Sequence, residues 1–293
     1  MKLYKYMSFS SAVRLLADGC VRFTQPGDFN DPFEMNPSFD LMSKQDLGAL
    51  PDAPESPGMK ILTPEAIRSM MLAILPGLQK SVAKHAGKDG VFSLRNNEMA
   101  QSTLDSEFGV FCLSETADSL LMWAHYADNH RGVAVQFDTS VPFFREGDLG
   151  FDLPNNGKVQ YLDKRPILSH SNLRSPNLLF RKSSAWAYEN EWRFIKRLSE
   201  SDRVIEAAPH PVHLFGIPPE SVTGIVVGCS VSDDDRLYLI EMCSRLPLIG
   251  ISIYQTRLHD EKYSLEIHPS LDGTIDPLAL TGRVLTARYS DEA

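Results

Sequence analysis

The stretch LLMWAHYADNHRGVAVQFD, from Leu120 to Asp138, constrains the fold more than any other part of this 293-residue chain. Its first half has apolar residues at helical spacing, which predicts a helix over about Ser119–Asn129. After Gly132, apolar and polar residues alternate through Val133–Phe137, which is the pattern of a strand. A helix that leads directly into a strand predicts a fold in which both kinds of element share one core.

Short patterns on either side of this stretch predict further elements. Ser8 or Ser10 can cap a helix that Gly19 ends, because glycine takes the left-handed conformation without a Cβ clash. In the C-terminal part, a strand, a helix capped by Ser232 and a second strand favour some parallel pairing. We expect strands at residues 3–6, 21–24, 109–114, 133–137, 159–161, 222–227, 249–255 and 263–267. The predicted fold class is α+β, with a mixed sheet as its core.

The long connection at about 38–108 has a different composition. Its first part is rich in proline, and the part that begins at Pro64 has apolar residues at helical spacing. We therefore predict a helical insertion at about 38–108 within a single α+β domain that covers residues 1–270. Residues 271–293 are predicted to form a polar C-terminal tail.

Charge and composition limit the classes of partner. The formal net charge of −9 argues against strong non-specific binding to nucleic acid. Arg174, Arg181 and Lys182 lie in a segment without acidic residues, which indicates either a local basic groove or, as is more usual for three charges, a solvated loop. No apolar run is long enough to cross a membrane, no secretory leader follows Met1, and the four cysteines are not closely spaced. These features predict a cytoplasmic protein with no membrane partner.

Three segments, 29–34, 120–138 and 186–194, combine aromatic and ionisable residues more densely than the rest of the chain. The first can be a rigid turn, since a residue before proline is held out of the helical region, or a polar cluster at the mouth of a pocket. We predict that the three segments converge on one site. The candidate binding residues in them are Asn30, Asp31, Glu34, Trp123, His125, Tyr126, His130, Arg131, Trp186 and Arg193.

Glu189 and Glu191 are the candidate catalytic residues. The alternation that follows them favours an extended segment, in which side chains two residues apart point to the same side. Two neighbouring carboxylates raise the pKa of one of them, which suits acid/base catalysis or stabilisation of an oxocarbenium-like transition state. The alternative interpretation is a structural ion pair between one glutamate and Arg131, Arg181 or Arg193.

His125 and His130 are five residues apart, which places them about 140° from one another around a helix. The histidines of helical zinc sites are four residues apart and share a face. We therefore expect no metal here. His130 and Arg131 suit the C-terminal end of the helix, where the dipole favours positive charge. His125 is either a polar group in a pocket or a satisfied, half-buried histidine.

The order of these motifs resembles the bacterial domain of unknown function 2971 family. The matching segments are LYKY at 3–6, FNDPFE at 29–34, FCLSE at 111–115, LMWAHYADNHRGVAVQFD at 121–138, WAYENEWRF at 186–194 and PESVTGIVVG at 219–228. The resemblance covers nearly the whole chain except 38–108. It implies membership of this family and no particular activity.

The chain is also similar to ADP-ribosyltransferase-like folds, which carry a polar residue on the first strand and a late glutamate in an E-x-E pattern that enters a strand. Here Glu-Asn-Glu precedes WRFI. This resemblance implies that Glu191 stabilises the transition state as nicotinamide leaves NAD, that Glu189 orients the acceptor, and that Tyr4, Lys5 or Tyr6 holds the dinucleotide. The chain departs from the pattern, since it has Lys5 where arginine or histidine is usual and lacks a Ser-Thr-Ser triplet.

Two other functions stay open. The first is a hydrolase of nucleic acid or nucleotides that would use Asp31, Glu34, His125, Glu189 and Glu191. The second is a non-catalytic interaction module, in which the tryptophans belong to the core and the charges form a structural network. The leading expectation is an ADP-ribosyltransferase-like enzyme that uses NAD, a toxin or phage-defence candidate whose small-molecule or macromolecular acceptor is unknown.

Overall fold

The computed structural model describes residues 1–35, 38–40, 93–94, 104–147, 149, 154–165, 167–168, 179–244 and 251–269. Most of the predicted insertion at about 38–108 and the whole predicted tail at 271–293 lie outside the described residues. The strands are β1 (Lys2–Met7), β2 (Cys20–Phe23), β3 (Ser38–Asp40), β4 (Ser93–Leu94), β5 (Phe108–Ser114), β6 (Val133–Asp138), β7 (Asn156–Lys158), β8 (Gln160–Leu162), β9 (Ile167–Leu168), β10 (Arg181–Ser183), β11 (Glu191–Arg197), β12 (Arg203–Ile205), β13 (Val212–Gly216), β14 (Val222–Val227), β15 (Ser252–Leu258) and β16 (Leu265–Pro269). The α-helices that lie wholly within the described residues are α1 (Phe9–Asp18), α4 (Leu120–Tyr126) and α5 (Asp233–Cys243), and the short 3₁₀ helices are η1 (Pro26–Asp28), η3 (Pro142–Phe144), η5 (Ser184–Glu189), η6 (Leu198–Glu200) and η7 (Pro219–Ser221).

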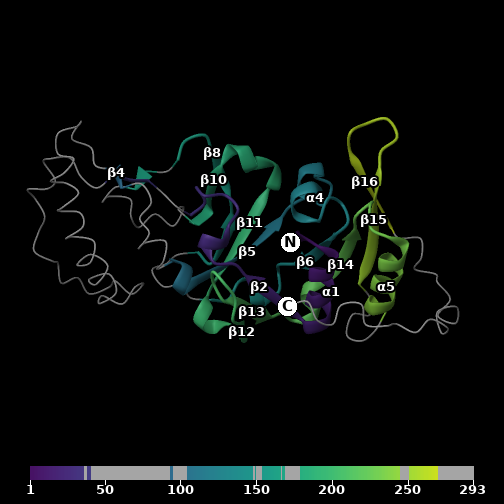
Figure 1. Ribbon diagram of the computed structural model, residues 1–293, viewed down its shortest axis with the longest axis horizontal. Helices are drawn as coiled ribbons and strands as arrows, with labels where there is room; N and C mark the ends of the chain where they lie inside the picture. Colours follow the sequence, from purple (N-terminus) through teal and green to yellow (C-terminus); the bar gives the residue numbers. More distant parts are fainter. Residues whose placement is uncertain are drawn as a thin grey trace, which may run out of the picture.

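Eight strands form one open sheet in the order β16-β15-β14-β6-β1-β5-β11-β7 (Figure 1). β14 and β15, which flank α5, pair in parallel, as the strand–helix–strand pattern predicts. The other neighbours in this sheet pair antiparallel. The predicted α+β class with a mixed sheet is therefore confirmed.

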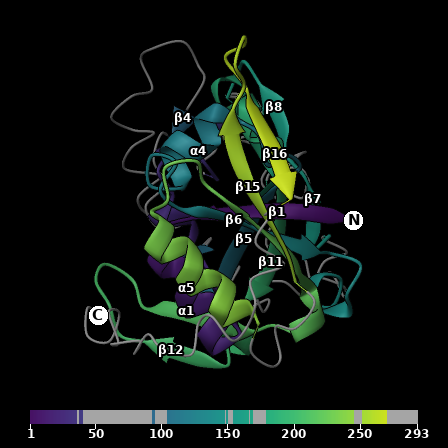
Figure 2. The same cartoon turned by 90° about the vertical axis from the view of Figure 1, so that its right-hand side faces the viewer.

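Helices cover both faces of the large sheet (Figures 1 and 2). On one face, Leu3 and Val135 belong to an apolar cluster that also includes buried residues of α1 and, on α5, Leu239. On the other face, α4 places Trp123 with its ring edge-to-face against Tyr6, at 5.1 Å between ring centroids. The first face is mainly a hydrophobic core, whereas the second leaves room for polar groups.

Local sequence explains α1, which follows β1 directly. The Ser8 hydroxyl accepts a hydrogen bond from the backbone N–H of Ser11 at 3.2 Å, and so caps the helix. Gly19 ends it with a φ of 63° and donates its N–H to the carbonyl of Leu15 at 2.9 Å. Both ends agree with the sequence prediction.

The helix α4 ends at Tyr126 and is shorter than predicted. Asp128, Asn129 and His130 all have positive φ values of 46°, 53° and 68°, which an α-helix does not accommodate. Gly132, two residues after His130, lies against the backbone carbonyl of Met7, the last residue of β1. A Cβ on residue 132 would overlap that carbonyl oxygen. This left-handed turn lets the chain enter β6 immediately beside the end of β1.

The sheet opens between β1 and β5. β1 pairs with β6 along all six of its residues, whereas its described pairing with β5 is confined to Tyr4 opposite Ser114. Farther along β5, Val110 exchanges two backbone hydrogen bonds of 2.9 Å with Thr24, which follows β2. The two strands therefore separate, and side chains from both of them surround the space between.

Candidate functional site

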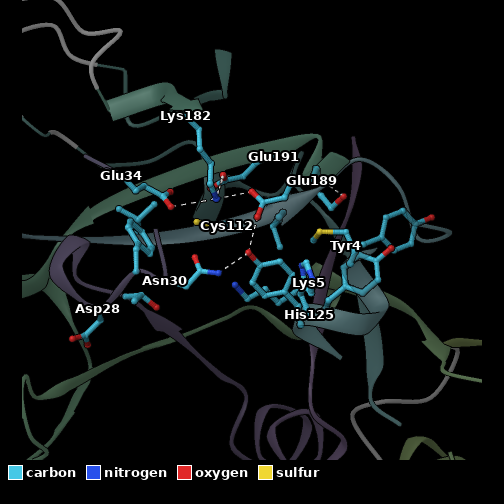
Figure 3. Close-up of a pocket in the computed structure, with 18 residues that line it drawn as sticks. Tyr4, Lys5, Asp28, Asn30, Glu34, Cys112, His125, Lys182, Glu189 and Glu191 are labelled. Atoms are coloured by element: carbon cyan, nitrogen blue, oxygen red, sulfur yellow. Dashed lines mark hydrogen bonds and ion pairs between the residues drawn. The ribbon is translucent and has the colours of Figure 1, made fainter. Parts of the chain in front are cut away.

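A pocket with a cavity volume of about 370 Å³ lies at the opening between β1 and β5 (Figure 3). Its walls come from these two strands, from residues 28–34, from α4 and from the region in which β10, η5 and β11 meet. Nine of the predicted residues line it: Tyr4, Lys5, Tyr6, Asn30, Glu34, His125, Tyr126, Glu189 and Glu191. All three of the segments that stand out in the sequence thus contribute side chains to one pocket.

Lys182, on β10, is the centre of a buried ionic cluster beside this pocket. Its Nζ lies 2.6 Å from a carboxylate oxygen of Glu189, 3.2 Å from one of Glu34 and 3.4 Å from one of Glu191. The lysine side chain is only 4% exposed. The solvated-loop interpretation is therefore wrong for Lys182, because three glutamates from two separate segments surround its ammonium group.

Arg193 supplies the second cation of the cluster and is completely buried. Its Nε donates to Glu191 at 2.8 Å, and its terminal nitrogens bond to Glu34 and to the backbone carbonyl of Leu179. Its guanidinium also lies 5.8 Å from the centroid of the Phe29 ring. Arg193 does not line the pocket, so it holds the carboxylates from behind.

Burial and the two cations act on the carboxylates in opposite directions. Burial by itself would raise the pKa of Glu191, but Arg193 and Lys182 outweigh it and lower this pKa to about 2. For Glu34 and Glu189, burial dominates and raises the pKa. With every group ionised, three negative and two positive charges leave a net charge of −1, which favours a positive ligand or a bound proton.

Tyr126 connects α4 to the cluster. Its hydroxyl donates to Glu189 Oε1 at 2.6 Å and accepts a hydrogen bond from the side-chain amide of Asn30 at 3.1 Å. Burial, together with the Glu189 carboxylate, raises the pKa of Tyr126, so the phenol remains a proton donor to Glu189. Glu189 therefore receives one neutral donor and one cation, Lys182, on its two oxygens.

Backbone contacts fix the two glutamates relative to β1. Glu191 lies opposite Ser114 on β5, and Ser114 lies opposite Tyr4 on β1, so the three residues form one row across the sheet. The Ser114 hydroxyl donates to the backbone carbonyl of Glu189 at 2.6 Å. The hydroxyl of Tyr161, on β8, accepts the backbone N–H of Glu191 at 2.8 Å. The turn from η5 into β11 is therefore held on two sides.

His125 stands at the exposed side of the pocket. Its Nδ1 is 2.9 Å from the hydroxyl of Tyr188, and the two rings meet edge-to-face at 5.8 Å. Burial, followed by the Glu189 carboxylate, raises the pKa of Tyr188. Of the two interpretations left open for His125, the structure supports a polar group in a pocket.

Six predicted binding residues lie away from the lining: Asp31, Trp123, His130, Arg131, Trp186 and Arg193, the last of which lies behind the carboxylates. Trp123 is a correction, since its ring is fully buried and its indole N–H bonds to the carbonyl of Ala117 at 2.8 Å. His130 stacks on the Trp123 ring at 6.3 Å between ring centroids, and Arg131 points to solvent beside Asp128. Asp31 accepts a backbone N–H within its own turn, and Trp186 packs on the Lys182 ammonium at 5.0 Å.

Half of the lining was not predicted from the sequence, including five polar residues: Thr24, Asp28, Cys112, Ser114 and Lys182. Lys182 carried a usable signal, since an acid-free basic segment shortly precedes the Glu-Asn-Glu tripeptide. Cys112 and Ser114 lie within a strand that is otherwise apolar, and burial raises the pKa of the Cys112 thiol. Nothing local to those two residues distinguishes them from core positions.

No cluster of three or more His, Cys, Asp or Glu side chains within the described ranges is arranged to hold a metal ion. In the glutamate cluster, Lys182 and Arg193 already occupy the positions next to the carboxylates that a metal ion would take. None of the described helices is both long enough and apolar enough to span a membrane.

A family model described as "Protein of unknown function (DUF2971)" matches residues 122–194. The matched segment runs from α4 to β11 and contains Tyr126, Lys182, Glu189, Glu191 and Arg193. No curated protein matches the chain. No solved structure matches it either. This match agrees with the family prediction made from the motifs over residues 122–194, and most of the ionic cluster lies inside the matched segment.

Proposed function

We propose that this chain, whose residues 122–194 match the DUF2971 family model, is an ADP-ribosyltransferase-like enzyme that consumes NAD. One observation carries the proposal. Glu191 begins β11, lies in one row with Ser114 and with Tyr4 of the first strand, and lines the pocket beside Glu189. A polar residue on the first strand and a late E-x-E pattern that enters a strand are the features that the resemblance implies.

The reaction would break the bond between the nicotinamide nitrogen and the ribose carbon, and would join that carbon to an acceptor. Positive charge develops on the ribose as nicotinamide leaves, and a fixed carboxylate stabilises it. Glu191 suits this role because its lowered pKa keeps it ionised. Glu189 suits the second role, since its raised pKa lets it take the proton that the acceptor releases while it orients that acceptor.

The rest of the lining supports a cationic, ring-bearing ligand. Tyr4, Tyr6 and Tyr126 present aromatic rings to the pocket, and the neighbouring cluster has a net charge of −1 when ionised. The nicotinamide ring of NAD is a cation, which aromatic rings and negative charge attract. Lys5, whose ammonium lies 5.3 Å from the Phe111 ring centroid, would hold the phosphates of the dinucleotide.

Nicotinamide release from NAD tests this proposal. The wild-type protein is incubated with NAD, with and without cell extract as a source of acceptors, and compared with Glu191→Gln. We expect the variant to lose activity by about 100-fold or more, because it lacks the charge that stabilises the transition state. Glu115→Gln is the matched control, since Glu115 follows β5 and pairs with Lys158 at 2.7 Å outside the pocket.

Two results would contradict the proposal. One is wild-type protein that releases no nicotinamide in either condition although it is folded by circular dichroism. The other is equal release by the wild type and Glu191→Gln. If Glu191→Gln lowered only the free energy of unfolding and there were no activity to lose, the cluster would be structural and the interaction-module interpretation would be favoured.

A further inference from the structure

Asn30 presents a side-chain amide to the pocket (Figure 3). Its Nδ2 donates to the Tyr126 hydroxyl at 3.1 Å, and that hydroxyl donates to Glu189 Oε1 at 2.6 Å. All three residues line the cavity, so this chain of hydrogen bonds follows its wall, as the dashed lines in Figure 3 show. The amide of Asn30 therefore lies beside the carboxylate cluster, within reach of a ligand in the pocket.

The chain of hydrogen bonds has one direction. An ionised carboxylate only accepts hydrogen bonds, so Glu189 takes the single proton of the Tyr126 hydroxyl. The pKa of Tyr126 is raised, which keeps this proton on the phenol. The Tyr126 oxygen must then accept from Asn30, and only the amide nitrogen of Asn30 can donate. The network thus fixes which way the Asn30 amide faces, with its carbonyl oxygen Oδ1 turned away from Tyr126.

The Oδ1 of Asn30 is an acceptor that receives no hydrogen bond from the described residues. The Asn30 side chain is exposed, so a ligand can approach this oxygen. The nearby carboxylates of Glu34 and Glu189 are acceptors as well, and their cluster has a net charge of −1 when ionised. A ligand group that binds here must therefore donate hydrogen bonds and carry no negative charge.

The other walls favour a flat ring that carries this donor group. Tyr4, Tyr6 and Phe29 line the same cavity, and aromatic side chains pack well against planar rings. A primary carboxamide on such a ring is uncharged and has two N–H donors. A carboxylate on the same ring has nearly the same shape, but it is negative and has only acceptors. Shape alone does not separate the two groups, whereas the polarity of the Asn30 amide does.

We infer that Asn30 is a specificity-determining residue, through which the pocket selects aromatic carboxamides over the corresponding carboxylates. Its Oδ1 accepts an N–H of the ligand's amide. Tyr126 is a positioning residue, since it fixes the direction of the Asn30 amide. The identity of the carboxamide as the nicotinamide end of NAD rests on the proposed function, but the selection itself rests on Asn30 and the acidic cluster.

Binding of benzamide and benzoate tests this selection, because neither reacts and they differ only in the group that Asn30 contacts. Titrations followed by ligand-detected NMR should show benzamide binding the wild-type protein at least about tenfold more tightly than benzoate, which would place a charge among acceptors. In Asn30→Leu, benzamide should bind about fivefold more weakly, because it loses a hydrogen bond, and benzoate should change by less than about twofold.

Asn155→Leu is the matched control. The side-chain amide of Asn155 also donates to one oxygen, the backbone carbonyl of Arg145 at 2.9 Å, and Asn155 does not line the pocket. This variant should keep the wild-type affinity for both compounds.

Tyr126→Phe is the second variant. Without the hydroxyl, the Asn30 amide can turn its nitrogen to the ligand, so the preference for benzamide should fall by about threefold although Asn30 is intact. A merely structural role of Tyr126 would weaken both compounds equally and leave the preference unchanged.

Three outcomes would overturn the inference: neither compound binds the wild type, both bind it equally, or Asn30→Leu keeps the full preference. Carboxamide selection in a protein that releases no nicotinamide would reject only the proposed NAD reaction. Nicotinamide release without carboxamide selection would reject only the role of Asn30.

Discussion

The two faces of the large sheet are built from the same strands, yet different interactions hold them together. On β5 and β11, Phe111 and Phe194 lie opposite one another and join the apolar cluster beneath α1 and α5. One position away, Cys112 lies opposite Arg193, on the face that carries the ionic cluster. Side chains alternate along a strand, so a slip of one residue in register would exchange the two faces.

This difference between an apolar and an ionic face indicates which of the two stabilises the fold. Apolar contacts on the first face tolerate small shifts and contribute in proportion to the area they bury. On the second face, each buried charge loses its hydration, and ion pairs with Lys182 and Arg193 offset that cost only when the partners are in place. We infer that the apolar face holds β5 and β11 in position, and that the pocket face depends on this positioning to keep three glutamates together.

The largest effect should follow from removing the central cation. We expect Lys182→Met to lower the free energy of unfolding at pH 7 by about 3–5 kcal/mol, because three buried carboxylates then share Arg193 alone. The loss should be smaller at pH 5. Glu34 and Glu189 have raised pKa values in the folded protein, so at low pH their protonation weakens the repulsion among the three carboxylates. As pH rises through these pKa values, both groups ionise and the repulsion returns.

Urea unfolding at the two pH values measures this difference. Lys158→Met is the control, because Lys158 makes a comparably short pair of 2.7 Å with Glu115 but is 49% exposed, and it should cost about 1 kcal/mol or less. A loss for Lys182→Met that is no larger than the control would show that the cluster is not an electrostatic unit.

An intermediate effect is expected on the apolar face. Ile225, on β14, is completely buried in the cluster with Leu3 and Val135. Ile225→Ala should lower the free energy of unfolding by about 2–4 kcal/mol through lost burial and the cavity it leaves. This loss should be equal at pH 5 and pH 7, since the contacts are apolar. A pH dependence like that of Lys182→Met would mean that the two faces are not independent.

Much of the fold could be predicted because its signals are local. Ser8 and Gly19 fix both ends of α1, and Ser232 caps α5 through the backbone N–H of Asp235. The alternation in β6 and the apolar run of β14 identify those strands without knowledge of their partners. The early end of α4 was not predicted. Asp128, Asn129 and His130 all have positive φ values, which these residue types rarely adopt in succession, so tertiary packing rather than local sequence sets this turn.

The site was only partly predictable, because its chemistry depends on distant pairings. Glu189 and Glu191 stood out as an acidic pair, and the structure adds that Lys182 and Arg193 hold them. Nothing in the sequence near Asp28 reveals that His210, 182 positions away, bonds to it. Such contacts arise when the strands are paired, so an unaligned sequence names the candidate residues without giving their partners.

The smallest effect concerns the hydrogen bond between Tyr126 and Glu189, at 2.6 Å. Tyr126→Phe should cost about 1 kcal/mol or less at pH 7, since the remaining contacts survive. It should also raise the pKa of Glu189 further, because the phenol hydrogen bond favours the ionised carboxylate. A carboxyl group whose folded-state pKa is raised contributes stability below its unfolded pKa, and that contribution is lost as pH rises through the folded value.

The pH at which this stabilisation disappears should therefore move upward in Tyr126→Phe, in a series of urea unfolding curves between about pH 4.5 and pH 8. Tyr161→Phe is the matched control, since its hydroxyl bonds to the Glu191 backbone and not to the Glu189 carboxylate. It should leave that transition in place. An equal upward shift in both variants would assign the effect to general loosening of the pocket. A downward shift in Tyr126→Phe would mean that the phenol does not donate to an ionised Glu189. It would also contradict the proposed roles, in which Glu191 stays ionised and Glu189 accepts a proton.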